Sequence, residues 1–514
     1  MSDRPWVSHY VEGTRPEIPP IPFRHLADMA RQTASRYAPT TAFTQCMPNG
    51  MDASLTYAQV DRLSDEFAAY LRGRLGLSAG DRVAVQMPNC LAYPVVVFGI
   101  FKAGCVLVNT NPLYTPPEMV HQFSDAGARV LVIIDMFSDR LPPVLPKTPV
   151  ETVVTVRITE FFPALQYTGG TTGVSKGGML SHGNLLANTA QMLEMAGPGL
   201  KPGVETVLTA LPLYHIFAFT VNFLGFYQSG GRDILIPSPR PPSNLKKAWE
   251  KYPVTWFTGV NTLFNALLNE PWFVQNPPKH LRYSGAGGMA LHGSVARRWQ
   301  EVTGTPVVEG YGLTETSPVV TFNPMGGQVK EGSIGIPLPS TEVRCVDESG
   351  VPVAQGEAGE LVTSGPQVMM GYWQRPEETE RVIRDGWLHT GDVAVMDEEG
   401  YFRIVDRKKD MVLVSGFNVY PNEVEECIAH HPGVQEVGVI GVPDDRTGEA
   451  VKAFVVKKDP GLTEEALVAH CRESLAPYKV PKKIEFRTEL PKTPVGKILR
   501  KDLRTAPVPE GAKV

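Results

Sequence analysis

A stretch rich in glycine and hydroxyl side chains, at residues 167–177, constrains this chain of 514 residues more than any other feature. It lies just after a short apolar run at residues 161–165. Glycines allow backbone N–H groups to turn toward an anion, and the threonine, serine and lysine side chains add donors and positive charge. We therefore predict a loop that binds a polyphosphate; a flexible surface loop is the alternative.

The order of residues in this loop differs from the G-x-x-x-x-G-K-[ST] loop of P-loop NTPases. Lys176 follows Ser175 and precedes Gly177. No glycine–lysine–hydroxyl triplet is therefore present to place the β- and γ-phosphates and Mg²⁺. The sequence argues against a phosphoryl-transferring NTPase of that class.

The composition indicates an ordinary globular protein with more than one domain. The chain is too long for a single core, and its hydrophobic share of 42% and charged share of 20% are typical of folded proteins. A net charge of −5 argues against a nucleic-acid-binding protein, which normally carries a basic face.

The cysteines and the N-terminus favour a reducing, cytoplasmic location. Reduced and mostly structural thiols are expected because no C-x-x-C pair occurs among Cys46, Cys90, Cys105, Cys345, Cys427 and Cys471. The N-terminus lacks the apolar core of a signal peptide, and no run of about 18 apolar residues is present. At most, peripheral contact with a membrane is expected.

Hydrophobic periodicity predicts layered α/β structure over the first two thirds of the chain. A helix should begin after the capping box of Thr56 and Gln59. Further helices are expected at residues 93–103 and 117–125 and from residue 261, and strands at residues 82–87, 106–108, 130–134, 207–211 and 256–258. Helices and apolar strands in alternation indicate a largely parallel sheet.

The pattern changes beyond residue 335. Short strands between Gly/Pro turns, at residues 342–346, 359–363 and 402–405, indicate a small antiparallel sheet. A compact α+β unit follows, with helices at residues 421–430 and 464–475 and strands at 437–440, 451–456 and 483–487. We predict an α/β fold: a large N-terminal domain of layered α/β sheets plus a small antiparallel β part (1–406), then a small mobile α+β C-terminal domain (407–514).

Residues 309–315, Glu-Gly-Tyr-Gly-Leu-Thr-Glu, form a second cluster that could carry chemistry. An aromatic ring between two glycines can lie flat on a purine, and Thr314 can reach a phosphate. Glu315 can hold Mg²⁺ through oxygen. A structural turn with a buried tyrosine is the alternative.

Three further clusters lie toward the C-terminus. Residues 387–392 end in Asp392, a carboxylate of the kind that accepts both ribose hydroxyls, although turns ending in Gly-Asp are common. The charged run at residues 406–410 falls where the pattern changes between domains; otherwise such a run is a solvated face. Residues 491–498 place Lys497 on a loop framed by proline and glycine, where a plain surface lysine is the alternative.

In this order the five clusters resemble those of the adenylate-forming enzymes, the family of acyl-CoA synthetases, firefly luciferase and peptide-synthetase adenylation domains. The resemblance covers nearly the whole chain. Residues 211–217, 258–265 and 406–421 are most similar to bacterial long-chain fatty acid–CoA ligases. The resemblance implies that a carboxylate attacks the α-phosphate of ATP to give acyl-AMP and pyrophosphate, and that the thiol of coenzyme A then releases AMP.

The resemblance also implies roles for individual residues. The β- and γ-phosphates of ATP would be held by Tyr167, Thr168, Gly169, Gly170, Thr171, Thr172, Gly173, Ser175 and Lys176. The adenine would be framed by Gly287, Gly288, Glu309, Gly310 and Tyr311. The ribose would be bound by Asp392 and Arg407, the α-phosphate by Thr314, and Mg²⁺ by Thr168 and Glu315.

Four more residues would serve catalysis and the motion between the two steps. His215 would wall the acyl site near the reacting carboxylate, or else be a core histidine. Lys497 would bridge that carboxylate and the α-phosphate in the first step. For the second step the C-terminal domain would rotate about Lys409, and the loop around Gly416 would line the tunnel for coenzyme A. Homodimers and peripheral membrane contact are common among relatives of this kind.

Two other functions stay open. An acyl-AMP ligase that loads a carrier protein is disfavoured, because the insertion typical of such relatives does not interrupt residues 406–421. A non-catalytic nucleotide-binding relative is disfavoured by the presence of Lys497, Glu315 and the glycine-rich loop. One departure from the family stands out: relatives carry some tens of extra residues where this chain has only residues 157–166.

Overall fold

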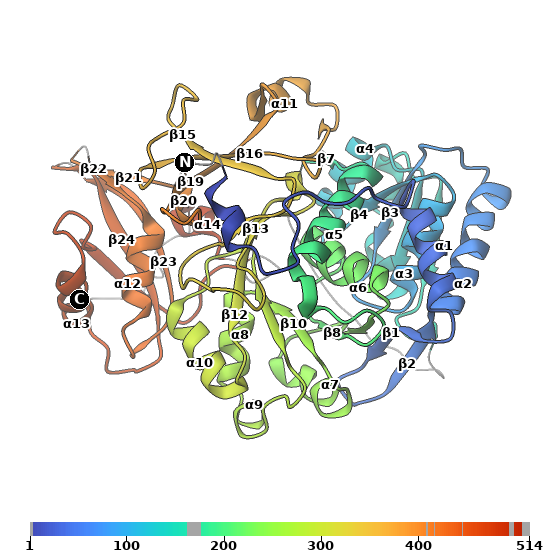
Figure 1. The fold of residues 1–514 in the computed structure, drawn as a ribbon, viewed down its shortest axis with the longest axis horizontal. Coiled ribbons are helices and arrows are strands. Elements are labelled where there is room, and N and C mark those ends of the chain that lie inside the picture. The colour runs from blue at the N-terminus through green and yellow to red at the C-terminus, as the bar shows by residue number, and fades with distance from the viewer. Residues whose placement is uncertain are drawn as a thin grey trace.

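A computed structural model describes residues 4–161, 176–407, 410–415, 417–444, 446–492 and 498–505. The first two thirds of the chain form two neighbouring sheets, and the later residues add an antiparallel sheet and a C-terminal α+β unit, as Figure 1 shows. The glycine-rich loop lies outside the described residues up to Ser175.

The smaller of the two N-terminal sheets is wholly parallel, in the order β4-β3-β5-β6. Its strands and the helices around it are α1 (Leu26–Arg36), α2 (Tyr57–Ala69), β3 (Arg82–Gln86), α3 (Ala92–Lys102), β4 (Val106–Asn109), α4 (Pro116–Ala126), β5 (Val130–Ile134) and β6 (Thr152–Val156). The predicted capping box is present, because the Thr56 side chain accepts from Gln59 N–H and Gln59 accepts from Thr56 N–H. Each element expected here from periodicity forms within one or two residues of its predicted bounds.

The larger sheet runs β14-β13-β12-β11-β10-β8-β9-β1-β2 and is parallel in its middle, from β12 to β1. Its strands are β1 (Thr41–Cys46), β2 (Asp52–Thr56), β8 (Thr206–Thr209), β9 (Arg232–Leu235), β10 (Trp256–Gly259), β11 (Tyr283–Ala286), β12 (Val307–Gly312), β13 (Val319–Phe322) and β14 (Ile336–Pro337). The accompanying helices are α5 (His182–Ala196), α6 (Phe226–Gln228), α7 (Lys246–Lys251), α8 (Asn261–Leu268), α9 (Pro271–Gln275) and α10 (Gly293–Thr303).

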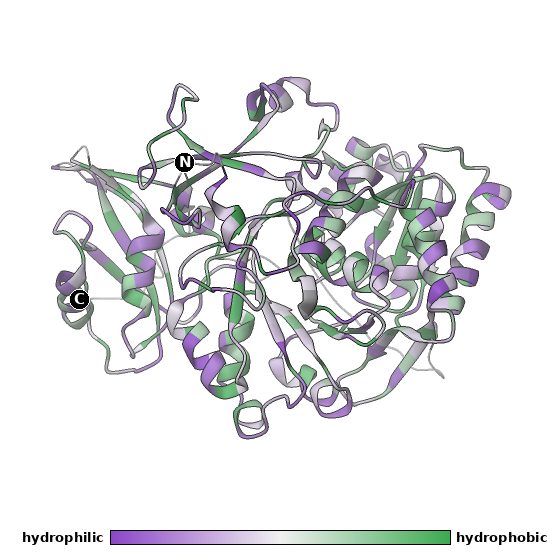
Figure 2. Ribbon diagram, in the orientation of Figure 1, coloured by the Kyte–Doolittle hydropathy of each residue, from purple (hydrophilic) through white to green (hydrophobic). Residues whose placement is uncertain are grey.

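The core of this part of the chain follows the hydropathy of the sequence. Helix α3 is buried on every face except at its last residue, Lys102, and it carries almost only apolar side chains. Helices α1 and α2 at the rim carry hydrophilic residues outward, as Figure 2 shows. A helix that is apolar all round belongs between layers, so α3 lies between the sheets and the outer helices.

The antiparallel part predicted beyond residue 335 is present. Strands β15 (Glu342–Val346), β16 (Ala358–Ser364), β18 (Ile383–Arg384), β19 (Trp387–Met396) and β20 (Phe402–Arg407) pair only in antiparallel fashion in the described residues. A short ladder joins β7 (Gly178–Met179) to β17 (Gly371–Tyr372), next to α11 (Pro376–Val382). This ladder places the end of the glycine-rich stretch beside residues nearly two hundred positions later.

The C-terminal unit packs its helices on a sheet of its own, ordered β22-β21-β24-β23 with β25 beside β24. Its elements are β21 (Val412–Val414), β22 (Phe417–Val419), α12 (Pro421–Ala429), β23 (Val434–Asp444), β24 (Gly448–Lys457), α13 (Glu464–Ser474), β25 (Lys483–Arg487) and α14 (Arg500–Thr505). A separate apolar cluster, which includes Val424, Val439 and Leu467, fills its interior. The boundary at residues 406–407 stays a prediction.

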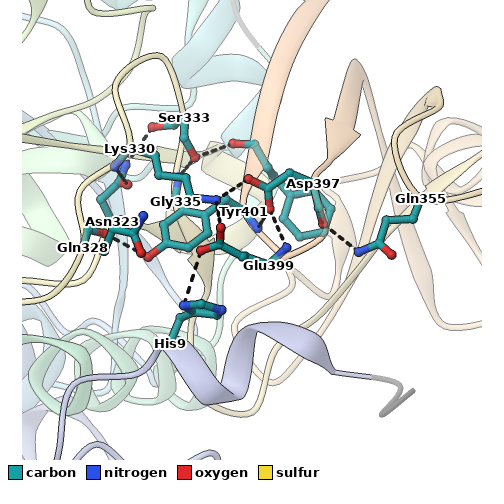
Figure 3. A network of polar contacts seen from close by, with 11 residues as sticks. His9, Asn323, Gln328, Lys330, Ser333, Gly335, Gln355, Asp397, Glu399 and Tyr401 are labelled. Atoms are coloured by element: carbon teal, nitrogen blue, oxygen red, sulfur yellow. Dashed lines mark hydrogen bonds and ion pairs between the residues drawn. The ribbon is translucent and has the colours of Figure 1, made fainter.

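The N-terminal segment contacts the turn of the β19–β20 hairpin through His9. Figure 3 shows His9 pointing toward Glu399, at 3.7 Å between Nδ1 and Oε2, with the His9 and Tyr401 rings 5.6 Å apart. Lys330 lies over the Tyr401 ring and bonds to Asp397 at 2.6 Å. These contacts fix the turn of the hairpin whose strands carry Asp392 and Arg407.

The mixed α/β class and the α+β C-terminal unit agree with the sequence prediction. Among the residues described, no helix combines the length and apolar composition needed to cross a membrane. All six cysteines are described, and each is free of a disulfide.

Candidate active site

A cavity of about 490 Å³ brings together most of the predicted site residues that the structure describes. Those that line it are His215, Gly287, Gly288, Gly310, Tyr311, Thr314 and Glu315. The cavity lies at the carboxyl ends of β8, β10, β11 and β12, since residues just beyond these strands form its wall. In open sheets with parallel strands, this edge is where ligands bind.

The rest of the cavity wall is apolar. It comes from α5, from the helical turn Ala218–Gly225, from α6 and from strands of the larger sheet, and includes Met192, Met195, Leu200, Phe226, Trp256, Phe322 and Met325. A pocket with a largely apolar wall and a few polar groups suits a ligand that has an apolar part and a charged part.

The glycines of β12 are required by close packing rather than by unusual backbone angles. A Cβ at Gly310 would lie 2.4 Å from the Phe322 ring, and one at Gly312 would lie 2.0 Å from the carbonyl oxygen of Pro318. Any side chain at these positions would push β12 away from β13. The two glycines thereby hold Tyr311 at the edge of the cavity.

Tyr311 connects the cavity to the predicted ribose site. Its hydroxyl donates to Asp392 Oδ2 at 2.6 Å. Asp392 in β19 is directly opposite Arg407 in β20, so the two residues predicted to bind ribose are cross-strand neighbours. The structure thus groups Tyr311, Asp392 and the backbone of Arg407.

Glu309 lies behind the cavity as a buried acid. Its carboxylate accepts the Leu291 N–H at 3.1 Å. Burial raises the pKa of Glu309 to about 8, which the Leu291 N–H partly opposes and the charge of Glu426 reinforces. A carboxyl group that is neutral near pH 7 can donate as well as accept a hydrogen bond, which suits recognition of a base edge.

Glu315 is held by a residue that the sequence did not single out. The Tyr372 hydroxyl donates to Glu315 Oε1 at 2.6 Å, and burial followed by the Glu315 carboxylate raises the pKa of Tyr372. Lys176 lies over the same ring, 5.7 Å from its centroid, and forms an ion pair with Glu378. The only local signal for Tyr372 is a Gly-Tyr-Trp triplet, and nothing in that spacing points to Glu315.

The fit of Mg²⁺ rests on Glu315 alone among the described residues. No group of three or more His, Cys, Asp or Glu side chains is arranged for a metal ion in the described part of the chain. A single carboxylate is a suitable partner for this ion, which usually keeps several waters and takes its other oxygens from substrate phosphates. Thr168, the other predicted ligand, lies outside the described residues.

His215 stands on the cavity wall at the start of a helical turn. Its Nδ1 accepts the Phe217 N–H at 3.3 Å, and the backbone N–H of His215 donates to the Pro212 carbonyl oxygen at 3.0 Å. With Nδ1 as acceptor, the neutral ring carries its proton on Nε2. The position fits a wall of the acyl site, and the catalytic role stays a prediction.

Several predicted residues fall where the structure gives no description. These are Tyr167, Thr168, Gly169, Gly170, Thr171, Thr172, Gly173, Ser175, Lys409, Gly416 and Lys497. The loop of Lys497 is nevertheless closed at its base by an antiparallel bridge between Lys492 and Ile498. That base shares a surface depression with Arg240, whose charge acts on Tyr214, the neighbour of His215.

Comparison with known proteins gives the same assignment over nearly the whole chain. The family model "AMP-binding enzyme" matches residues 30–163 and 159–373, and "AMP-binding enzyme C-terminal domain" matches residues 423–497. A long-chain-fatty-acid–CoA ligase of Escherichia coli O157:H7 is 49% identical over 551 aligned positions, which cover 97% of each chain.

Solved structures of relatives are similar in fold. ATP-bound MatB from Rhodopseudomonas palustris has a TM-score of 0.83 at 31% identity, covering 93% of this chain and 98% of its own. The anthranilate CoA ligase AuaEII, in complex with anthranoyl-AMP, has a TM-score of 0.86 at 28% identity, covering 95% and 98%.

The comparisons also locate the departure noted in the sequence. The "AMP-binding enzyme" model matches in two segments, which overlap at residues 159–163. The alignment with the Escherichia coli relative, at 551 positions, is longer than this chain of 514 residues. The break coincides with the short connection before the glycine-rich loop. On the extent of these matches, the chain belongs to the AMP-binding enzyme family.

Proposed function

We propose that this protein is an AMP-forming fatty acid–CoA ligase that activates a medium- or long-chain fatty acid with ATP and transfers it to coenzyme A. One observation carries the proposal: a single cavity joins Tyr311, Thr314 and Glu315 to a deep apolar wall. An adenylate and a fatty acyl chain would meet there at the acyl–phosphate bond. The high identity to a curated long-chain ligase supports the same choice of substrate.

In the first step the described residues orient ATP. The Tyr311–Asp392 pair and Arg407 would hold the adenosine, with Glu309 and the neighbouring glycines around the base. Glu315, positioned by Tyr372, would hold Mg²⁺, which neutralises phosphate charge and orients the phosphates. Lys176 would exchange its ion pair with Glu378 for the outgoing pyrophosphate.

Lys497 completes the first step in this proposal. The charge that develops on the α-phosphate needs a cation placed in advance, and Lys497 would supply it. In the second step the C-terminal domain would rotate about Lys409, and the loop at Gly416 would admit the thiol of coenzyme A. Peripheral membrane contact and a homodimer are parts of the proposal that rest on the family resemblance, and a cytoplasmic location rests on the pattern of the cysteines.

The test measures AMP and pyrophosphate release from purified protein, with and without coenzyme A, over short- to long-chain fatty acids and aromatic acids. We expect release with long chains and a strong increase with coenzyme A. Release indifferent to coenzyme A would favour a carrier-protein ligase, and no release with any acid would favour a non-catalytic nucleotide-binding protein. A preference for aromatic acids would contradict the proposed fatty acid substrate and would favour an aromatic acid, as in the anthranilate CoA ligase AuaEII.

A further inference from the structure

Two thiols from adjacent helices meet in the C-terminal unit. Cys427 in α12 packs against the apolar cluster that contains Cys471 in α13, and the interaction between the two thiols shifts the pKa of both. The Cys427 sulfur also lies 3.2 Å from Ser474 Oγ, one turn beyond Cys471 on the same helix. Cys471 is fully buried, whereas Cys427 is half-buried, so a small reagent from solvent reaches Cys427 first.

The surroundings favour the thiolate form of Cys427. The Cys471 thiol lowers the pKa of Cys427 against the opposing effect of burial, with further help from Ser474, His470 and His430. His470 is fixed beside it, because its Nε2 lies 2.9 Å from the Cys427 carbonyl oxygen. The thiolate is the reactive form of cysteine, and donors and positive charges nearby increase its population.

The remaining four thiols lie in a different environment. Cys46, Cys90, Cys105 and Cys345 are buried, and burial raises the pKa of each thiol above its ordinary value. Buried neutral thiols react slowly. All six cysteines are in the described part of the chain, and Cys427 alone among them combines access with a stabilised thiolate.

We propose that Cys427 and Cys471 form a reversible oxidation site for hydroperoxides. The Cys427 thiolate attacks one oxygen of hydrogen peroxide, the O–O bond breaks, and hydroxide leaves and is protonated to water. The Cys471 thiol then attacks the sulfenic sulfur, so that an S–S bond forms and the S–O bond breaks. The hydroxyl that leaves the sulfenic sulfur combines with the Cys471 proton and forms a second molecule of water. Together the two sulfurs have given two electrons to the peroxide.

The disulfide would join α12 to α13 inside the C-terminal unit. The first turns of α12 already contact β20 and α14, since Asn422 N–H donates to Asp406 of β20 at 2.7 Å and Glu425 pairs with Arg500 of α14 at 2.8 Å. Cys427 lies at the other end of that helix. The site depends on these two helices alone and is independent of the proposed ligase activity.

The test treats reduced, full-length protein with graded hydrogen peroxide, alkylates the remaining thiols and identifies cross-linked peptides by mass spectrometry. We expect a Cys427–Cys471 disulfide at peroxide concentrations that leave the four buried thiols reduced, so that these thiols can still be alkylated after denaturation. Dithiothreitol should reduce the disulfide again. Absence of that link, or equal oxidation of the buried thiols, would overturn the proposal.

Variants separate the roles of the two sulfurs. Cys471→Ser should shift Cys427 to sulfinic and sulfonic acid, because no second thiol traps the sulfenic acid. Cys105→Ser is the matched control and should leave the disulfide yield unchanged. As a measurement independent of the cross-link, Ser474→Ala should raise the pH of half-maximal alkylation at Cys427. The thiolate assignment would be contradicted if the pH midpoint of Cys427 alkylation were the same in the wild type and in Ser474→Ala and were no lower than that of N-acetylcysteine.

Discussion

Burial gives Glu309 a protonation state that its sequence position does not reveal. Its folded pKa of about 8 lies above the 4.5 of an exposed glutamate, so folding takes up a proton between these values. Stability from this group is therefore complete below about pH 4.5 and is lost as the pH rises through 8. The size of the effect is roughly a few kcal/mol, because it arises from desolvation in the interior.

Glu309→Gln should remove this pH dependence while keeping an oxygen for the Leu291 N–H. The melting temperature of the variant relative to the wild type should rise steadily between pH 5 and pH 8 in differential scanning fluorimetry. The difference between the two proteins cancels other groups that titrate nearby, such as His292. A difference that stays constant with pH would show that Glu309 is ionised in the folded protein.

Tyr372→Phe should weaken the magnesium response of the enzyme. The variant keeps the ring beneath Lys176 and loses only the hydrogen bond to Glu315, a bond to a charged group that contributes about 1.5–3 kcal/mol. We expect the Mg²⁺ concentration at half-maximal rate to rise roughly tenfold, together with weaker Mg·ATP binding in calorimetry. Tyr10→Phe, which loses a bond to the Pro337 carbonyl, is the matched control and should change neither.

At the scale of elements, strand β12 depends on glycines that have no space for a larger side chain. Gly312→Ala would place a Cβ against the Pro318 carbonyl and force β12 from β13, at a cost of roughly 1–3 kcal/mol. Gly73→Ala is the matched control, since nothing lies within 4 Å of its Cβ and its backbone is helical. Thermal unfolding should show Gly312→Ala destabilised and Gly73→Ala unchanged or more stable; equal effects would contradict the packing explanation.

The sequence predicted elements better than their arrangement. Local signals such as the capping box at Thr56 or the apolar run at residues 130–134 decide whether a helix or a strand forms, so both were found. Strand β1 was missed because nearly all of it is buried and it has no alternating pattern. Sheet order was beyond reach as well, since it joins β1 to β9 across almost two hundred residues.

For the site as well, the sequence indicated individual residues but not the contacts between them. Clusters along the chain pointed to Tyr311 and Asp392 separately, and their hydrogen bond, across 81 positions, required the fold. Tyr372 was missed because its partner Glu315 lies 57 positions away in the sequence. A motif identifies residue types suited to a ligand, whereas the contact that orients them depends on tertiary structure.

Across the whole molecule, the two chemical steps place different demands on the C-terminal unit. The base of the Lys497 loop shares a depression with Arg240 of the N-terminal part, on the side of Tyr214 and His215. In the proposed mechanism Lys497 serves adenylation. The thiol of coenzyme A would later approach the carbonyl carbon of acyl-AMP, so Lys497 would have no place in that second step.

Lys497→Ala should therefore separate the two half-reactions. ATP–pyrophosphate exchange should fall by roughly 10²–10³-fold or more, because the developing charge on the α-phosphate loses its cation. Thioester formation from supplied acyl-AMP and coenzyme A should stay near the wild-type rate. Lys458→Ala, an exposed lysine of the same unit, is the control and should alter neither rate. Loss of both half-reactions in Lys497→Ala would contradict this division, since a lysine needed only for folding or domain position would affect both steps together.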